Sequence, residues 1–352
     1  MTGNRETVPA GQRLTDDQRD RWHTVLDHLA AALPDRAAQV VVDGTDGGAA
    51  LLADRLAGRL RAAGRRCIRL AAANCATEDD GWRDRTADRV VIADGARWRD
   101  RLPATAWDLT IWVRTPSGDT TSGGYRGDST DAVVDLHDRT WPVIRHLDPR
   151  LVPSGVWYRT ESQAFFAARA ATWDTKFGND LPAYAAAVTE AGLRPGGVVL
   201  DVGCGTGRAF PALRDAVGPH GTVLGVDLTP QMLTAARDRA HRYGTTLVLA
   251  DARQLPFADA TADAVFAAGL ITHLPDPDAG LTELARIARP GGRLVLFHPS
   301  GRAALAARHG RTLRPDEPLA EPVLRATTAR TGWHLTSYDD PPHRFHAVAI
   351  RH

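Results

Sequence analysis

The chain has 352 residues, a length that fits two domains better than one. Its 43 lysine and arginine residues almost balance its 42 aspartate and glutamate residues, so the formal net charge is +1. This balance argues against a protein that binds nucleic acid or another polyanion.

Cysteine use and hydropathy indicate the compartment. Cys67, Cys75 and Cys204 form no CxxC pair and no even-numbered framework, which favours a reducing compartment and argues against a structural zinc site. The N-terminal stretch MTGNRETVPAGQRLTDDQ is polar, and no run of about 18 apolar residues occurs, so we expect neither secretion nor a membrane span. The sequence therefore predicts a cytoplasmic protein without a bound metal.

Strand-like and helix-like segments alternate in the first half. Residues 16–33 carry apolar side chains at helical spacing and follow Thr15, a favourable N-cap. Residues 116–130 are polar and glycine-rich, and we expect them to be mobile. The other predicted elements are a helix at 49–63 and strands at 39–43, 66–71, 89–93 and 108–113. This alternation is typical of a parallel, doubly wound sheet.

A domain boundary is expected at DPRLVPSG, residues 148–155, where two prolines and a glycine interrupt the periodicity. We therefore place the domains at residues 1–152 and 153–352. A helical entry segment, residues 161–193, precedes the second alternating series. The strands predicted there are 198–202, 222–226, 246–250, 262–267, 293–298, 334–338 and 343–351. The fold class is α/β, with two doubly wound, Rossmann-like domains of three layers each.

The sequence VVLDVGCGTG, residues 198–207, places Gly203, Gly205 and Gly207 between a buried strand and a helix. Glycines there permit a tight turn and a close approach of the backbone to a ligand. A dinucleotide-binding GxGxxG loop would need a glycine where Arg208 stands, so a nicotinamide cofactor fits less well. Taken alone, the loop also fits a purely structural turn.

The ends of the following strands strengthen the interpretation of this loop. Asp227 ends the next strand, where a carboxylate can accept hydrogen bonds from two ribose hydroxyls. Asp251 ends the strand after that and can accept a hydrogen bond from an adenine amine, while Ala252 offers a backbone amide to a ring nitrogen. His273 lies just past the fourth strand. Four such strand ends in this order are difficult to obtain by chance.

The runs VLDVGCGTG, GVDLTPQML, ADARQLPF, GLITHLPD and RIARPGGRLVLF resemble the class I S-adenosylmethionine-dependent methyltransferases that act on small molecules. The resemblance covers about residues 160–352 and implies a seven-stranded sheet whose last strand is antiparallel. It also implies S-adenosylmethionine as cofactor, with the glycine loop under the methionine part, Asp227 on the ribose and Asp251 on the adenine. The implied cofactor-binding residues are Asp201, Gly203, Cys204, Gly205, Thr206, Gly207, Asp227, Leu228, Met232, Asp251, Ala252 and Gly269.

Methyl transfer by in-line SN2 displacement asks mainly for placement and exclusion of water, with a general base where the acceptor is a hydroxyl or an acidic carbon. His273 and His298 are the candidate bases, with a structural role or catalysis by placement alone as alternatives. Trp173, Phe177 and His273 are candidate acceptor-binding residues, although the aromatic side chains also fit packing between helices. We expect a small-molecule acceptor, and the sequence does not distinguish an oxygen, nitrogen or carbon nucleophile.

The first half resembles the uridine kinase-like P-loop proteins over about residues 15–150, on QVVVDGTDGGAALLADRLAGRL and RVVIADGARWRDRLPATAWDLTIWV. A phosphate loop needs a lysine for the phosphates and a hydroxyl for magnesium. Here Ala49 replaces the second glycine, Ala50 the lysine and Leu51 the hydroxyl. The chain's one lysine, Lys176, lies in the other half. We therefore expect no catalysis of phosphoryl transfer by this degenerate domain.

Several alternatives stay open from the sequence. The first domain would bind a nucleoside-like or phosphorylated ligand without turning it over, pair two chains in a homodimer, or stabilise its neighbour. For the whole protein, the alternatives to methyl transfer are a phosphotransferase, a non-catalytic cofactor sensor or scaffold, and an enzyme that uses S-adenosylmethionine for other chemistry.

Overall fold

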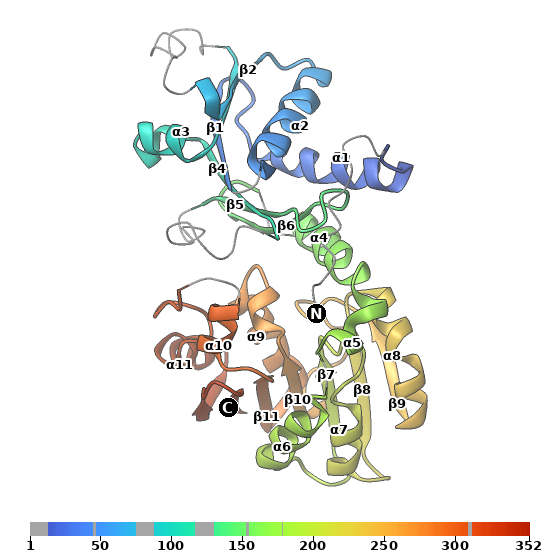
Figure 1. Ribbon diagram of the computed structural model, residues 1–352. Coiled ribbons are helices and arrows are strands. Elements are labelled where there is room, and N and C mark those ends of the chain that lie inside the picture. The colour runs from blue at the N-terminus through green and yellow to red at the C-terminus, as the bar shows by residue number, and fades with distance from the viewer. Residues whose placement is uncertain are drawn as a thin grey trace, which may run out of the picture. The chain divides into compact units, whose positions relative to one another are not determined.

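The computed structural model describes residues 13–44, 47–74, 88–116, 130–152, 155–177, 179–308 and 312–352. The chain divides into two compact units, residues 1–153 and 154–352 (Figure 1). Most of the glycine-rich segment predicted at 116–130 lies outside the described residues, as does Cys75.

The first unit is an α/β domain that begins with a well-capped helix. Thr15 and Gln18 form a capping box at the start of α1, in which each side chain bonds the other residue's backbone N–H. The elements are α1 (Asp16–Ala31), β1 (Ala38–Gly44), α2 (Gly48–Ala62), β2 (Cys67–Leu70), η1 (Ala72–Asn74), β3 (Val90–Asp94), α3 (Ala96–Arg101), η3 (Ala104–Ala106), β4 (Leu109–Arg114), β5 (Ala132–Asp135) and β6 (Val143–Leu147). The predicted helices and strands up to β4 are confirmed within a few residues.

The sheet of the first unit has the strand order β2-β3-β1-β4-β5-β6. Figure 1 shows α1 and α2 on one side of this sheet and α3 on the other. Strands β1 to β5 pair in parallel, but β6 is antiparallel to β5, so the prediction of a parallel sheet is wrong for this edge. Residues 136–142, which join the two strands, are too few for a parallel crossover.

The P-loop-like segment of this unit lies between β1 and α2. A Cβ atom on Gly44 would come within 2.6 Å of the Val113 carbonyl oxygen, so packing against β4 already requires this glycine. Ala49 is buried and Ala50 is partly exposed in the first turn of α2. These methyl groups offer a phosphate neither charge nor hydrogen bonds. The resemblance to uridine kinase-like proteins stays a prediction.

The second unit begins with four helical segments and continues as a second alternating series. Its elements are α4 (Gly155–Ala167), η5 (Ala170–Thr172), α5 (Trp173–Phe177), α6 (Leu181–Ala191), β7 (Val198–Val202), α7 (Phe210–Val217), β8 (Thr222–Asp227), α8 (Pro230–Arg242), β9 (Thr245–Leu249), β10 (Ala262–Ala268), η6 (Ile271–His273), α9 (Pro277–Ile287), β11 (Ala288–His298), α10 (Arg302–Arg308), α11 (Glu321–Arg330), β12 (Trp333–Asp339) and β13 (Phe345–Arg351). All seven predicted strands are present.

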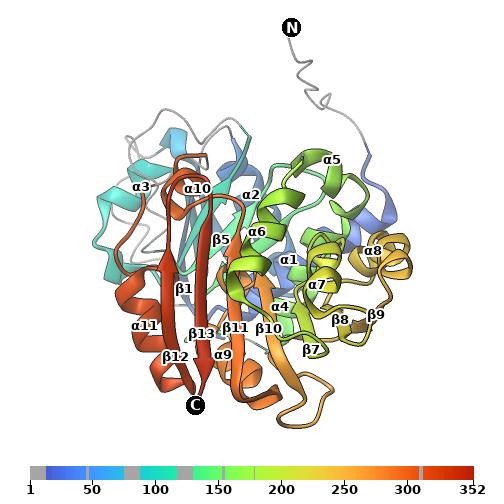
Figure 2. The same ribbon diagram turned by 90° about the horizontal axis from the view of Figure 1, so that it is seen from below.

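The second sheet has the order β12-β13-β11-β10-β7-β8-β9. Figure 2 shows the last strand, β13, between β12 and β11, and it is antiparallel to both. The antiparallel seventh strand implied by the resemblance is thus confirmed. Helices α6, α7 and α8 pack on one face through a core that includes Phe210, Phe266 and Phe297. Helix α9 contacts β11, and the Trp333 indole of β12 donates a hydrogen bond to the Leu281 carbonyl of α9 at 3.0 Å.

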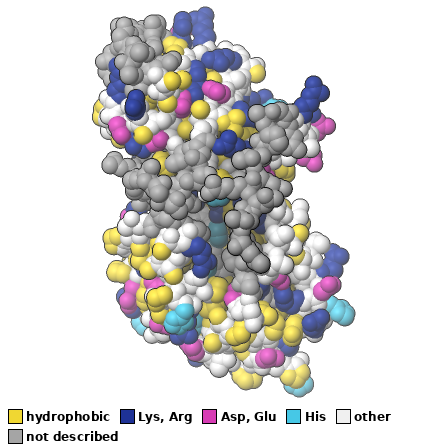
Figure 3. All heavy atoms as spheres, viewed as in Figure 1, with side chains coloured by type: hydrophobic (Ala, Val, Ile, Leu, Met, Phe, Trp, Pro, Cys, Tyr) yellow, Lys and Arg dark blue, Asp and Glu magenta, His cyan; other side chains and the backbone are white. Residues whose placement is uncertain are grey.

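On the face drawn in Figure 3, basic and acidic side chains of the described residues are interspersed. Among these residues, no helix is both long enough and apolar enough to cross a membrane.

Candidate cofactor and active site

The candidate site lies at the carboxyl ends of the parallel strands β7, β8, β9, β10 and β11. Strand β7 pairs with β8 on one side and with β10 on the other, so the direction of winding reverses at β7. Ligands of open α/β sheets bind at such a switch point. The loops after β7 and β10 approach closely there, because a Cβ atom on Gly203 would lie 3.2 Å from Leu270 Cδ1.

The glycine loop after β7 is held against β8 and leaves open space at its centre. The backbone N–H groups of Gly203 and Cys204 both donate to the Val226 carbonyl, at 2.8 and 2.9 Å. Gly205 has a φ of +53°, in the left-handed region, and a Cβ atom there would meet no atom within 4 Å. A ligand can therefore approach the backbone at Gly205 closely.

Asp227, at the end of β8, faces this loop. Its Oδ2 accepts a hydrogen bond from the Gly205 N–H at 2.9 Å, and its Oδ1 accepts one from the Thr229 N–H at 2.8 Å. Burial raises the pKa of Asp227, and the backbone N–H groups of Thr229 and Gly205 oppose this effect. Asp227 is partly exposed and a carboxylate has about four lone-pair positions, so it keeps acceptor capacity for ligand hydroxyls.

Asp201 is the fourth residue of β7 and is 1% exposed. Burial, with a smaller contribution from the Asp227 carboxylate, raises the pKa of Asp201 to about 8. The folded protein therefore holds a proton on this carboxyl group at neutral pH. The predicted cofactor-binding role of Asp201 would thus use a carboxylic acid, which can donate a hydrogen bond as well as accept one.

We expect Asp201→Asn to gain stability relative to the unmodified protein as the pH rises from 5 to 8. The pKa of the unfolded carboxyl group is near its usual value of 3.8, whereas burial raises the pKa of the folded one to about 8. Between these values only the unfolded chain loses the proton, so the free energy of unfolding falls with rising pH. Asparagine does not ionise and escapes this loss.

The measurement is the difference in Tm between variant and unmodified protein across this pH range. Asp238→Asn, an exposed change on α8, serves as the control and should give a difference that does not vary with pH. A constant difference for Asp201→Asn as well would show that Asp201 is already ionised in the folded protein at pH 5.

Asp251 follows β9 and binds Arg253 with both of its oxygens. Arg253 donates from its backbone N–H at 3.0 Å and from Nε at 3.1 Å to Oδ1, and from Nη2 at 2.8 Å to Oδ2. Burial disfavours the charged form, but these hydrogen bonds outweigh it and hold the pKa of Asp251 below its usual range. The Arg253 guanidinium also lies 4.4 Å from the ring centroid of Tyr158 in α4. We did not predict the pairing of Arg253 with Asp251 from the sequence. The separation of two residues between them is the only signal for it there.

Asp174 of α5 ties the entry segment to the glycine loop. It accepts hydrogen bonds from Thr206 Oγ1 at 2.6 Å, Arg208 Nη1 at 3.0 Å and Arg239 Nη2 at 2.8 Å. The Thr206 hydroxyl is therefore engaged inside the protein, and the Thr206 carbonyl accepts a hydrogen bond from Arg239 Nη1. The predicted contact of Thr206 with the cofactor stays a prediction. No motif in the sequence marked Asp174, because its partners lie 32 to 65 residues away along the chain.

The candidate acceptor-binding residues meet at Phe166 in α4. The ring centroid of Phe166 lies 5.7 Å from that of Trp173 and 5.2 Å from that of His273. The structure thus brings Trp173 and His273 to one aromatic cluster that joins α4, α5 and η6. The side chain of Phe177 lies outside the described part of the protein.

His298 ends β11 and is bound through Nδ1. This atom lies 2.9 Å from the Ser300 carbonyl oxygen and 3.1 Å from the Ser300 nitrogen. A Cβ atom on Gly269, in the loop after β10, would be 3.8 Å from His298 Cδ2. Burial lowers the pKa of His298, so the imidazole is neutral at pH 7.

The remaining predicted cofactor residues lie in the loops after the strands, except Met232, which lies in the first turn of α8. The Leu228 carbonyl accepts a hydrogen bond from Gln163 Nε2 of α4 at 2.9 Å, and the Gly269 N–H donates to the Phe297 carbonyl at 2.8 Å. Cys204, Met232 and Ala252 are buried. Among the described residues, no group of three or more His, Cys, Asp or Glu side chains is placed to hold a metal ion.

Comparison with known proteins identifies the domain that contains this site. Residues 200–296 match the family described as a methyltransferase domain. This region of the second unit is therefore similar to methyltransferase domains. Its cofactor is S-adenosylmethionine, as the match to this family supports.

A curated relative of this methyltransferase domain is the ubiquinone/menaquinone biosynthesis C-methyltransferase UbiE of Burkholderia mallei (strain SAVP1), with 40% identity over 112 residues. The match covers 31% of this chain and 46% of that protein. The protein of the same name from Burkholderia thailandensis gives the same values. The chain thus spans about half the length of the curated relatives that it matches.

Solved structures similar to the chain include an S-adenosylmethionine-dependent methyltransferase from Aquifex aeolicus, with 22% identity and a TM-score of 0.45 over 53% of this chain and 98% of that one. Another is a putative methyltransferase in complex with the Haloferax volcanii Trm112 activator, with 22% identity and a TM-score of 0.44 over 53% and 97% of the two chains.

The residues of the methyltransferase domain fit this cofactor. The space at Gly205 admits a ligand against the backbone, and Asp227 keeps lone pairs for ribose hydroxyls. Asp251 has three hydrogen bonds from Arg253, so one of its about four lone-pair positions is left for an adenine amine.

Proposed function

We propose that the protein transfers a methyl group from S-adenosylmethionine to a small-molecule acceptor. The observation that carries the proposal is the pairing of the open glycine loop at Gly205 with the Asp227 carboxylate at the switch point of the sheet. The match to the methyltransferase family over residues 200–296 supports it. The near-neutral charge favours a small acceptor over a nucleic acid.

In this proposal the chain's own residues hold the cofactor, exclude water and accept a proton. The loop from Gly203 to Gly207, Asp227 and Asp251 would hold the cofactor. When bound, S-adenosylmethionine supplies an electrophilic methyl group on a sulfonium, so that placement of the acceptor matters most. Phe166 and Trp173 form an apolar wall beside His273 that would keep water from the acceptor.

The proposal is tested by incubating the full chain with S-adenosylmethionine and a panel of small phenols, enols and amines. Acceptor-dependent formation of S-adenosylhomocysteine, together with a methylated product by mass spectrometry, would support it. Binding of S-adenosylhomocysteine without product from any acceptor would favour the sensor or scaffold, and an altered but unmethylated acceptor would favour other S-adenosylmethionine chemistry.

With an acceptor that reacts through a hydroxyl or an acidic carbon, we expect His298→Gln to lower kcat by roughly 100-fold or more, the usual contribution of a general base. His298 acts as a base through Nε2 in the tautomer whose Nδ1 proton is donated to the Ser300 carbonyl, whereas in the other tautomer Nδ1 accepts from the Ser300 N–H and Nε2 carries the proton. The unmodified enzyme should lose activity as the pH falls below the lowered pKa of His298, and the variant should not.

His273→Gln is the matched control for this test. We expect it to raise the KM for the acceptor more than it lowers kcat, because His273 packs edge-on against Phe166 in the aromatic cluster. A larger loss of kcat for His273→Gln than for His298→Gln would assign the base to His273 instead.

A further inference from the structure

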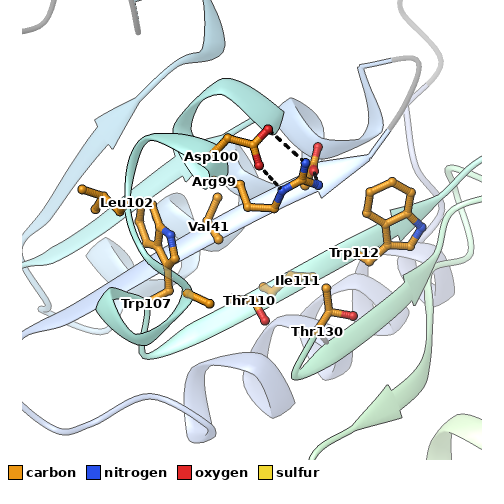
Figure 4. Close-up of a pocket in the computed structure, with 11 residues that line it drawn as sticks. Val41, Arg99, Asp100, Leu102, Trp107, Thr110, Ile111, Trp112 and Thr130 are labelled. Carbon is orange, nitrogen blue, oxygen red and sulfur yellow. Dashed lines mark hydrogen bonds and ion pairs between the residues drawn. The ribbon is translucent and has the colours of Figure 1, made fainter. Parts of the chain in front are cut away.

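The first unit contains a pocket of about 290 Å³ that the methyltransferase domain does not share. It lies on the face of the sheet formed by Val41 and Asp43 of β1 and their parallel neighbours on β4, Thr110 and Trp112. Arg99 of helix α3 also lines the pocket. In Figure 4, Trp107 and Trp112 lie at opposite ends of the pocket, with Arg99 between them.

The charges that line this pocket disfavour an anion. Arg99 donates hydrogen bonds to both oxygens of Asp100, at 3.0 and 3.3 Å, and forms a short ion pair with Asp43 Oδ2. The lining therefore has one guanidinium and two carboxylates, and the guanidinium is already engaged by both. A phosphate or carboxylate ligand would have to displace these partners and would face their charge.

Two buried polar groups of the pocket can form further hydrogen bonds, one as a donor and the other as an acceptor. Trp107 is 6% exposed, and its Nε1 has no hydrogen-bond acceptor among the described residues. Asp43 is 5% exposed and accepts from the Gly44 N–H at 2.8 Å and from Arg99, which uses about two of the four lone-pair positions of a carboxylate. A buried donor without a partner is destabilising, and a ligand acceptor would relieve this.

The shape and size of the pocket limit the ligand further. Its volume of about 290 Å³ is at the lower end for small-molecule sites, so a single ring with short substituents fits better than a larger molecule. Indole rings at both ends favour a flat aromatic ligand, because aromatic pairs add offset or edge-to-face contacts to simple burial.

We propose that this pocket binds a small, uncharged, planar molecule of the heteroaromatic carboxamide class. The ligand accepts a hydrogen bond from Trp107 Nε1 and donates one to the Asp43 carboxylate. This site is independent of the methyltransferase activity, and it gives the first unit a binding role for a neutral ligand in place of phosphoryl transfer.

The test uses nicotinamide as the probe and nicotinate as its anionic counterpart of nearly equal size. The full chain has nine tryptophans, and the indole N–H signal of Trp107 is identified in ¹H–¹⁵N spectra by its loss in Trp107→Phe. We expect millimolar nicotinamide to shift this signal and nicotinate to leave it in place. Absence of a shift with nicotinamide, or an equal shift with nicotinate, would overturn the proposal.

Two variants measure the contribution of each group. Trp107→Phe keeps a ring but removes the donor, and it should weaken nicotinamide binding about tenfold, as should Asp43→Asn, which removes the charge of the acceptor. Trp22→Phe is the matched control, because Trp22 is buried in the same unit and its Nε1 already donates to the Arg139 carbonyl at 3.1 Å. Its nicotinamide affinity should equal that of the unmodified protein. Unchanged affinity in both pocket variants would overturn the assignment.

Discussion

Asp227→Ala should raise the Kd for S-adenosylhomocysteine by roughly 100-fold to 1,000-fold, because two hydrogen bonds to a charged acceptor contribute about 1.5–2 kcal/mol each. The carboxylate stands at the end of β8 with lone pairs to spare beyond its bonds to Gly205 and Thr229. The methyl group of alanine replaces neither those bonds nor the contacts that we expect with the ribose. Isothermal titration calorimetry on the full chain measures the change.

Two further variants make this test specific. Asp227→Asn keeps an oxygen that can accept from the Gly205 N–H, so we expect an intermediate loss of about tenfold from the missing charge. Asp238→Ala removes an exposed aspartate from the helix that follows β8 and should leave binding unchanged. Affinity of Asp227→Ala within threefold of the unmodified protein would contradict the assignment of Asp227 to the cofactor.

The strands of the second unit could be predicted because their signals are local. Each is a short apolar run between glycines, prolines or charged residues, and the structure has all seven. In the first unit, β5 and β6 were not predicted, and each of these short strands carries a charged residue, Asp135 and Arg145. The direction of β6 depends on the length of the connection after β5, and the hydrophobic pattern does not report it.

The contacts of the candidate site likewise fall into those that the sequence predicts and those that it does not. Gly203, Gly205 and Asp227 follow strand ends, so the parallel sheet places them together, and the sequence predicts their meeting. The contacts of Asp174 with Thr206, Arg208 and Arg239 depend on how short helices fold back over the sheet. Likewise, the contacts of the Phe166 ring with both Trp173 and His273 depend on how these segments pack. Side-chain partners set by tertiary packing have no fixed spacing in the chain.

The glycines of the loop after β7 should differ in what they contribute, and Gly207→Ala should be the most destabilising change among them. Gly205 and Gly207 both have a φ in the left-handed region, +53° and +78°, so an alanine at either position strains the backbone. Of these two, only Gly207 would place the new Cβ against a side chain, 2.3 Å from Cε2 of Phe210. The Phe210 ring is 0% exposed and also fills the space left by Gly225.

We therefore expect Gly205→Ala to lower the free energy of unfolding by about 1 kcal/mol through backbone strain. For Gly207→Ala we expect a loss of about 3 kcal/mol, because overpacking of the core adds to the same strain. Urea denaturation of the full chain, followed by circular dichroism, measures both values. Equal losses in the two variants would show that the Phe210 contact does not require a glycine at position 207.

Binding should show the reverse order. The backbone at Gly205 borders open space, so a methyl group there would stand where the cofactor is expected and should weaken S-adenosylhomocysteine binding by tenfold or more. Folded Gly207→Ala protein should keep most of its affinity. Adding Phe210→Leu to Gly207→Ala should restore part of the lost stability, because the smaller side chain makes room for the new methyl group, whereas adding it to Gly205→Ala should only destabilise further. This coupling would separate a glycine needed for packing from a glycine needed for the ligand.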